Sequence, residues 1–294
     1  MKGKVALIVG GTSGIGRACA LQLAQRGYNI MIVGRNQEAG DSVVATVERA
    51  GVRGRFIRGD VSLMQEVRRI AAEIGQQTAA IHLLIHCTDV ILNKRIETAE
   101  GVELSFATNF LSRFLINELL LPLLKAGAPA RIVHVAAPGL PIKINLANLP
   151  PPPNLSSFSG HNIGQGANNL YSIEMAARLE GNGVSIVVMN PGMVDTDIRR
   201  RSSDMPAIFK AVGWLVETLF KSMTTTSEQC AEIVLRVALS PETADWNGKL
   251  VSRTGKLLKT HAHDTDPARR HELWQRSERA ISVIEPSNPL FAVA

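Results

Sequence analysis

The first sixteen residues of the chain contain the pattern that most restricts its fold. A short apolar run, Val5–Val9, leads directly into a turn with three glycines, Gly10, Gly14 and Gly16, in the spacing G-x-x-x-G-x-G. Glycines there let the backbone approach a pyrophosphate, and the helix that follows offers free N–H groups and the positive end of its dipole. A glycine pattern alone is a weak signal, but this one lies between a predicted strand and a predicted helix. We therefore predict that the segment cradles a dinucleotide.

Apolar runs and amphipathic stretches alternate along most of the chain. The pattern predicts strands at 5–9, 29–33, 54–58, 81–86, 131–135 and 185–189, and helices near 15–26, 36–50, 63–79, 99–125 and 162–181. The strands show little polar alternation, which is typical of strands that are buried on both faces. Strands that alternate with helices imply right-handed crossovers and a parallel sheet. We predict an α/β protein, a single Rossmann domain whose doubly wound parallel sheet has helices on both faces.

Two segments interrupt this alternation. Leu149–Gly160 is rich in proline and serine, which predicts a loop. Residues 197–225 contain a separate amphipathic helix at about 206–222, which packs against the domain, forms a lid over a ligand, or contacts a membrane surface or another subunit. We expect the Rossmann domain to span residues 1–255, with 197–225 inside it. Residues 256–294 are expected to form a polar tail with a short helix at 267–281.

The composition narrows the range of partners. The net charge of +6 lies partly in Arg199–Arg201 and Arg269–Arg270, which have no interleaved aromatic residues, so we expect a polyanionic cofactor rather than nucleic acid. No apolar run is long enough to span a bilayer, so stable membrane insertion is not expected. Cys19, Cys87 and Cys230 lack the spacing of a metal site and suit a reducing compartment. We therefore expect no metal and predict a cytoplasmic location.

The end of the second predicted strand bears on the type of nucleotide. An acidic residue there would accept hydrogen bonds from a free 2′-hydroxyl, but this chain has Arg35 between a glycine and an asparagine. Arg35 could pair with a 2′-phosphate, and Arg17 could add a second cation, although each arginine alone also suits a solvated surface. Together they favour NADP(H) over NAD(H). Asp60 and Val61, after the third strand, are expected beside the adenine.

These features resemble the short-chain dehydrogenase/reductase family over about residues 1–255, especially its retinol-dehydrogenase-like members. Asn109, in ATNFLSRFLI, matches the asparagine of the family's catalytic tetrad, and residues 191–196 match its PG-x-V-x-T signature. The resemblance implies that Thr196 and the backbone near Val194 hold the nicotinamide carboxamide. The cofactor-binding residues expected from the motifs and the resemblance are Gly10, Thr12, Ser13, Gly14, Ile15, Gly16, Arg17, Arg35, Asp60, Val61, Gln165, Pro191, Gly192, Val194 and Thr196.

Three catalytic positions of the family hold other residues in this chain. Alignment places Ala137 at the position of the serine, His161 at that of the tyrosine and Gln165 at that of the lysine. The two tyrosines, Tyr28 and Tyr171, have no lysine four residues later, so no other register supplies the Tyr-x-x-x-Lys pair. Hydride transfer to a carbonyl builds negative charge on oxygen and needs a proton donor. The usual donor is therefore missing.

Some of the replacements could take part in chemistry. Asn109, which matches the family's asparagine, and His161 are the candidate catalytic residues. Imidazole is a competent acid near neutral pH, so His161 could donate a proton. His161 could also be a helix-start residue with no role, or one that only binds. Gln165 can hydrogen-bond a ribose hydroxyl but adds no positive charge. Asp89 stands where the family has a glycine, and it places a carboxylate near the nicotinamide ribose unless its side chain turns to solvent. His134 is expected to be structural.

The sequence leaves three functions open. The first is a noncanonical NADPH-dependent reductase of an activated substrate, such as an iminium or a conjugated enone. The second is a non-redox enzyme, a cyclase or isomerase, and the third is an inactive NADP(H)-binding protein or a partner subunit of an active relative. The substrate is expected to be a small molecule, and the apolar helix at 206–222 hints at a hydrophobic one. The helices at 99–125 and 162–181 could form a homo-oligomer or serve the internal core.

Overall fold

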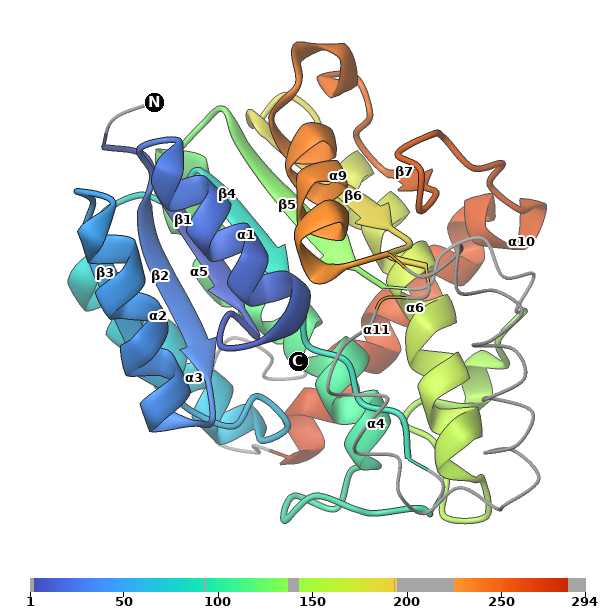
Figure 1. Ribbon diagram of the computed structural model, residues 1–294. Helices are drawn as coiled ribbons and strands as arrows, with labels where there is room; N and C mark the ends of the chain where they lie inside the picture. The colour runs from blue at the N-terminus through green and yellow to red at the C-terminus, as the bar shows by residue number, and fades with distance from the viewer. Residues whose placement is uncertain (1–2, 93, 137–142, 193, 195–224, 285–294) are drawn as a thin grey trace.

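A seven-stranded parallel sheet forms the centre of the molecule (Figure 1). The computed structural model describes residues 3–92, 94–136, 143–192, 194 and 225–284. The strand order is β3-β2-β1-β4-β5-β6-β7, and every neighbouring pair is parallel. The strands are β1 (Val5–Val9), β2 (Asn29–Gly34), β3 (Gly54–Arg58), β4 (Leu83–His86), β5 (Ala130–Val135), β6 (Val184–Met189) and β7 (Lys249–Val251).

Helices cover both faces of this sheet, as Figure 1 shows. One face carries α1 (Gly14–Gln25), α2 (Gln37–Arg49) and α9 (Ser227–Leu239), and the other carries α3 (Met64–Gln77), α5 (Ser112–Ala126) and α6 (Ser157–Arg178). Ala6 and Ile8 of β1 pack toward the first group, while Leu7 and Val9 pack toward the second. Burying a side chain such as Leu7 or Ile8 stabilises the fold by about 1.5–3 kcal/mol. The predicted doubly wound α/β fold is confirmed.

The strand order reverses beside β1. The chain runs outward from β1 through β2 to β3, then crosses back to β4 on the other side of β1. Such a reversal opens a crevice at the carboxyl ends of the two central strands, where ligands bind in open α/β sheets. Here it brings the turn after β1 against the segment after β4. A Cβ added to Gly10 would lie 3.0 Å from the backbone of Cys87 and of Thr88.

Two secondary-structure predictions were incomplete. The predicted helix at 99–125 is interrupted: α4 (Leu104–Phe106) leads into a π-helical segment, η1 (Ala107–Leu111), before α5 begins. A π turn disturbs the hydrogen-bond ladder of a helix without changing its apolar pattern, so the pattern could not reveal it. The sequence also missed β7, whose three residues are too few to give a periodicity.

The prediction of a loop over Leu149–Gly160 was wrong at its carboxyl end, because α6 begins at Ser157. The Ser156 hydroxyl caps the helix by accepting from the Ser159 N–H. The hydroxyl of Ser157 donates to the buried carboxylate of Glu103 at 2.7 Å, which anchors this first turn. Gly160 is required for the approach, because a Cβ there would lie 2.3 Å from Glu103 Oε2. The prolines upstream concealed a helix start that depends on this distant carboxylate.

The predicted helix at 267–281 is present as α11 (Pro267–Ile284), which lies against α6 beside the short α10 (Ala262–Thr265). Its Trp274 ring lies 5.1 Å from the Phe114 ring and 5.6 Å from the Tyr171 ring, centroid to centroid. The Arg178 guanidinium lies 3.8 Å over the same indole. Apolar side chains of α5 and α6 that could have formed a subunit contact thus serve the internal core. None of the described helices is long and apolar enough to cross a bilayer.

Candidate active site

The glycine turn after β1 is closely packed and leaves backbone N–H groups at the start of α1. Gly10 and Gly14 have φ of 85° and 52°, a region that favours glycine. A Cβ on Gly16 would lie 2.1 Å from the Gly10 carbonyl oxygen, so the turn excludes any side chain there. Ser13 is the N-cap residue of α1, and its side chain makes no capping hydrogen bond. The turn therefore fits a phosphate group, which would accept from these N–H groups.

Of the two arginines predicted to select the nucleotide, Arg35 lies near Asp60 at the ends of β2 and β3, while Arg17 lies in α1 and does not line the cavity there. Arg35 Nη1 lies 3.7 Å from Asp60 Oδ2, and its side chain is 64% exposed. Arg69 is held by Glu66 and Glu73 at 2.9 Å, whereas Arg35 has only its longer contact with Asp60, and Arg58 forms no ion pair with a described carboxylate. A cavity of about 410 Å³ is lined by Arg35, Arg58, Gly59, Asp60, Glu66 and Arg69. It is open and basic enough to admit a 2′-phosphate.

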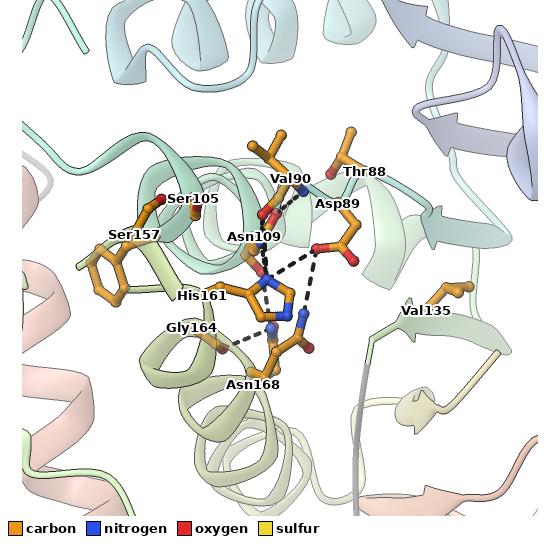
Figure 2. A network of polar contacts seen from close by, with 12 residues as sticks. Thr88, Asp89, Val90, Ser105, Asn109, Val135, Ser157, His161, Gly164 and Asn168 are labelled. Atoms are coloured by element: carbon orange, nitrogen blue, oxygen red, sulfur yellow. Dashed lines mark hydrogen bonds and ion pairs between the residues drawn. The ribbon is translucent and has the colours of Figure 1, made fainter. Parts of the chain in front are cut away.

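Asn109 lies within the π-helical segment and is clamped to the segment after β4. Its Oδ1 accepts from the Val90 N–H at 2.8 Å, and its Nδ2 donates to the Val90 carbonyl at 2.8 Å. These two bonds fix the orientation of the amide, because the flipped amide would place Nδ2 against the Val90 N–H. The remaining Nδ2 hydrogen points to His161 Nδ1, 3.0 Å away (Figure 2). The predicted catalytic pair, Asn109 and His161, is therefore in direct contact.

This contact determines where the His161 ring carries its proton. Asn109 Nδ2 can only donate, so Nδ1 of a neutral His161 ring must accept, and the proton resides on Nε2. His161 is the fifth residue of α6 and is buried, with Val90 O at 3.3 Å and Asp89 Oδ1 at 3.6 Å from Nδ1. Nε2 lies on the edge of the ring away from these groups. The arrangement presents an N–H donor, as a proton-delivering residue requires.

Asp89 turns its carboxylate toward α6 rather than fully to solvent. Its Oδ1 accepts from Gln165 Nε2 at 3.4 Å and lies 3.6 Å from His161 Nδ1, and its side chain is 31% exposed. Figure 2 shows the Asp89 side chain extending from the segment after β4 toward the His161 ring. The structure thus brings together an imidazole, a carboxylate and an amide at the carboxyl end of β4. The alternative in which Asp89 points away from the site does not hold.

Asn168, one helical turn after Gly164, links this cluster to the sheet. Its Nδ2 donates to the carbonyls of Asn109 and Gly164, both at 2.9 Å. Its Oδ1 must then accept from His134 Nδ1 at 3.2 Å, which places the His134 proton on Nδ1. The π turn makes the Asn109 carbonyl available for this bond. His134 is therefore a structural residue of the sheet, as expected, and it supports the residue that orients His161.

The same chain of hydrogen bonds continues to β4. Asn117 Nδ2 donates to His134 Nε2 at 3.0 Å, and Asn117 Oδ1 accepts from His86 Nε2 at 2.9 Å. Burial, together with the nearby Arg113 cation, lowers the pKa of His86 to about 3, against the opposing effect of its bond to Asn117. Burial also lowers the pKa of His134 well below its ordinary value. The hydrogen bonds require a neutral His134 ring, because its Nδ1 donates and its Nε2 accepts, and the low pKa of His86 makes that ring neutral as well.

Arg113 is a fully buried cation behind the site. Its Nη2 donates to the carbonyls of Thr88 at 2.6 Å and Val135 at 3.0 Å, and so ties together the ends of β4 and β5. Nε and Nη1 have no hydrogen-bond partner among the described residues. Burial lowers the pKa of Arg113 to about 10, and the Asp89 carboxylate opposes that shift. The sequence analysis did not identify Arg113, although a charged residue inside the apolar run FLSRFLI was a usable signal.

The segment after β6 forms the opposite wall. The Asn190 side chain accepts from the Gly192 N–H at 2.8 Å, and Gly192 has φ of 72°, as a tight turn requires. Val194 is buried and pairs with Thr225 in a parallel bridge. Three of the predicted features, Ala137, Thr196 and the helix at 206–222, lie outside the described residues.

Comparison with known proteins agrees with this geometry. Residues 4–140 match the family model described as short chain dehydrogenase. The chain is 34% identical over 257 residues to an uncharacterized oxidoreductase of Schizosaccharomyces pombe, and the match covers 82% of this chain and 74% of the relative. The chain belongs to the short-chain dehydrogenase family. This short-chain dehydrogenase is also 30% identical to mouse polyprenol dehydrogenase, over 93% of this chain and 81% of the relative. It is 31% identical to human retinol dehydrogenase 11, over 82% and 74%.

Solved structures of the family share the fold. An NADP active-site complex of RhlG from Pseudomonas aeruginosa is 22% identical, with a TM-score of 0.68 over 87% of this chain and 96% of that chain. A blue fluorescent protein from a metagenomic library, in complex with NADPH, is 22% identical, with a TM-score of 0.68 over 86% and 97%. At these identities the likeness shows the fold. The predicted resemblance to retinol-dehydrogenase-like members is confirmed by the sequence relatives.

Proposed function

We propose that this short-chain dehydrogenase is an NADP(H)-dependent reductase of an activated C=N, C=C or C=O substrate, with His161 as its proton donor. The observation that carries the proposal is the contact between Asn109 Nδ2 and His161 Nδ1 at 3.0 Å. It directs the ring proton to Nε2 and holds the ring beside the crevice where the strand order reverses. A histidine with no role would not need an amide clamped by two backbone hydrogen bonds to fix its tautomer.

The residues present fit a dinucleotide. The turn at Gly10 and Gly16 has no room for a side chain, and the start of α1 offers N–H groups to a pyrophosphate. Arg35 and Arg58 line the cavity at the ends of β2 and β3, which supports NADP(H) rather than NAD(H). When bound, the cofactor supplies a hydride. The rest of the chemistry falls to the residues of this chain.

Those residues suit a substrate that needs little stabilisation of negative charge. Reduction of a ketone builds an oxyanion, and a family member would meet it with a serine hydroxyl, a phenol and an ammonium group. Here the predicted lysine position holds the neutral Gln165, and the carboxylate of Asp89 lies 3.6 Å from the proton donor His161. A carboxylate there disfavours an oxyanion and favours a cationic nitrogen. An iminium substrate, which forms no oxyanion, therefore fits best.

The rim of the site favours an apolar substrate. The segment after β4 meets the start of α6, where Arg95 donates to the Leu155 carbonyl and His161 lies against Val90. Exposed apolar side chains occur on both segments, with Ile91 at 44% and Phe158 at 62% exposed. Large apolar side chains that are exposed near a site are suited to contact a hydrophobic small molecule.

The test is NADPH oxidation with a panel of iminium, conjugated enone and ketone substrates of increasing apolar size. We expect turnover of the iminium and enone members. His161→Phe should lower enone reduction by about 10²–10⁴-fold, because the enolate formed by hydride addition loses its proton donor. Iminium reduction should change little, because hydride addition to C=N⁺ gives a neutral amine without a proton. His271→Phe, on the exposed face of α11, is the matched control and should have no effect. An unchanged rate of enone reduction in His161→Phe would remove the proposed role of the ring.

Two other outcomes would refute the reductase itself. Substrate conversion without any change in nicotinamide absorbance would indicate a non-redox enzyme. If the protein by itself turns over no substrate but forms a stable complex with a relative that has the full set of catalytic residues, it would be a partner subunit.

A combined Ala137→Ser, His161→Tyr and Gln165→Lys variant should gain ketone reduction if the site is otherwise a reductase site.

A further inference from the structure

The carboxylate of Asp89 is the one acidic group that the described structure places beside both His161 and Gln165. Its Oδ1 faces Gln165 Nε2 at 3.4 Å and His161 Nδ1 at 3.6 Å. Its Oδ2 has no hydrogen-bond partner among the described residues, and 31% of the side chain is open to solvent. His161 Nδ1 already accepts from Asn109, so a neutral ring has no proton to give to Asp89. Asp89 therefore retains acceptor capacity toward the crevice.

The position of Asp89 indicates which half of a bound dinucleotide its free carboxylate oxygen would contact. Asp89 follows β4, whereas the basic cavity with Arg35 and Arg58 lies two strands away at the ends of β2 and β3. The glycine turn after β1 lies between the two. A pyrophosphate at that turn would place the adenosine on the side of the basic cavity and the nicotinamide riboside on the side of Asp89.

The charges around this end of the crevice are unbalanced toward negative. Arg113 is close, but it is fully buried and donates to the carbonyls of Thr88 and Val135 rather than to Asp89. The Glu103 carboxylate accepts from Ser157 at the start of α6 and from the Phe106 N–H of α4, and no cation pairs with it among the described residues. Gln165 is neutral. No described lysine or arginine side chain forms an ion pair with Asp89.

We propose that Asp89 binds the nicotinamide-ribose end of the cofactor and makes the site favour the oxidised, cationic nicotinamide over the reduced, neutral one. This inference rests on the proposed binding of NADP(H). A carboxylate accepts hydrogen bonds from ribose hydroxyls, and its charge attracts a pyridinium ring but gains nothing from a dihydropyridine. Because tighter binding of the oxidised form lowers the reduction potential, the bound reduced cofactor becomes a stronger hydride donor. The acidic replacement thus offsets the missing cation by assisting hydride release.

The test compares dissociation constants, so it does not depend on turnover. NADP⁺ and NADPH are titrated into the wild-type protein and into Asp89→Asn. Calorimetry measures the binding of NADP⁺, and fluorescence measures the binding of NADPH. We expect the ratio of the two dissociation constants to shift by about fivefold against NADP⁺ in the variant, the scale of a partly exposed charge pair. For a two-electron couple a fivefold shift corresponds to about 20 mV. Asp89→Ala repeats the measurement should the asparagine variant fold poorly.

Two controls isolate the effect. Glu97→Gln removes a carboxylate from the same segment, one that pairs with Arg95 at 2.9 Å, and should leave the ratio unchanged. Adenosine 2′,5′-bisphosphate lacks the nicotinamide riboside, so Asp89→Asn should not alter its affinity. An unchanged NADP⁺ to NADPH ratio, or an equal loss of affinity for the bisphosphate, would overturn the inference. Failure of the wild type to bind any of the three ligands would instead refute the proposed cofactor.

Discussion

Glu118 on α5 gives the sharpest test of the energetics inside the fold. One of its carboxyl oxygens, Oε1, is buried without a hydrogen-bond partner among the described residues. Burial raises the pKa of Glu118 from 4.5 to about 7; the Arg178 cation opposes this shift and Glu278 reinforces it. The folded state therefore holds a proton that the unfolded state has lost above pH 4.5. The resulting stabilisation is fully present below that pH and disappears as the pH rises through 7.

The magnitude follows from the two pKa values. At about 1.36 kcal/mol per unit, the rise from 4.5 to about 7 corresponds to about 3 kcal/mol, of which about 2.5 kcal/mol is lost between pH 5 and pH 8. Glu118→Gln has no proton to lose, so its free energy of unfolding should fall less over that interval by this amount. Denaturant unfolding at both pH values measures it, with the exposed Glu48→Gln as the control. Parallel pH profiles for wild type and Glu118→Gln would refute the reasoning.

Two further predictions concern the cofactor turn and the basic cavity. Arg35→Asp should weaken NADPH binding by about 1.5–3 kcal/mol and NADH binding much less, because a charge-assisted phosphate contact is lost; equal weakening in titrations of both nucleotides would mean that Arg35 does not touch the phosphate. Gly16→Ala would place a Cβ 2.1 Å from the Gly10 carbonyl oxygen, so both thermal stability and nucleotide affinity should fall. Gly75→Ala in α3, where a Cβ meets nothing within 4 Å, should instead raise stability by about 0.5–1 kcal/mol. A Gly16→Ala protein as stable as Gly75→Ala would disprove the steric argument.

The fold was predictable because its signals are local. Most of the predicted strands contain apolar runs flanked by turns, and the glycine turn fixes both the strand before it and the helix after it. The errors occurred where distant residues decide the structure. Helix α6 begins early because Glu103, more than fifty residues upstream, accepts from Ser157. The three residues of β7 form a strand because β6 supplies their hydrogen-bond partners, which no short sequence window contains.

The candidate site was predictable only in its outline. The sequence named Asn109, His161 and Gln165 from their spacing, and the structure places the first two in contact. The direction of the Asp89 side chain could not be foreseen, because it depends on α6, seventy-six residues later in the chain. Arg113 was missed for a related reason. Its hydrogen-bond acceptors are backbone carbonyls at two strand ends, and because every residue has a carbonyl, the sequence does not reveal which ones accept.

The chemistry of the buried network bears on whether the site is still in use. Keeping a charge such as Arg113 out of water costs several kcal/mol, and apolar side chains of similar volume often fill such a space at lower cost. A site that only had to fold would gain stability by replacing Arg113, His86 and His134 with hydrocarbon. Here the two neutral histidines continue a single direction of hydrogen bonding from Asn168, which donates to the backbone carbonyl of Asn109. Such a cost is reasonable where the backbone at Asn109 and the ends of β4 and β5 must be held in place around a site, and this supports the proposal of an active enzyme over an inactive binding protein.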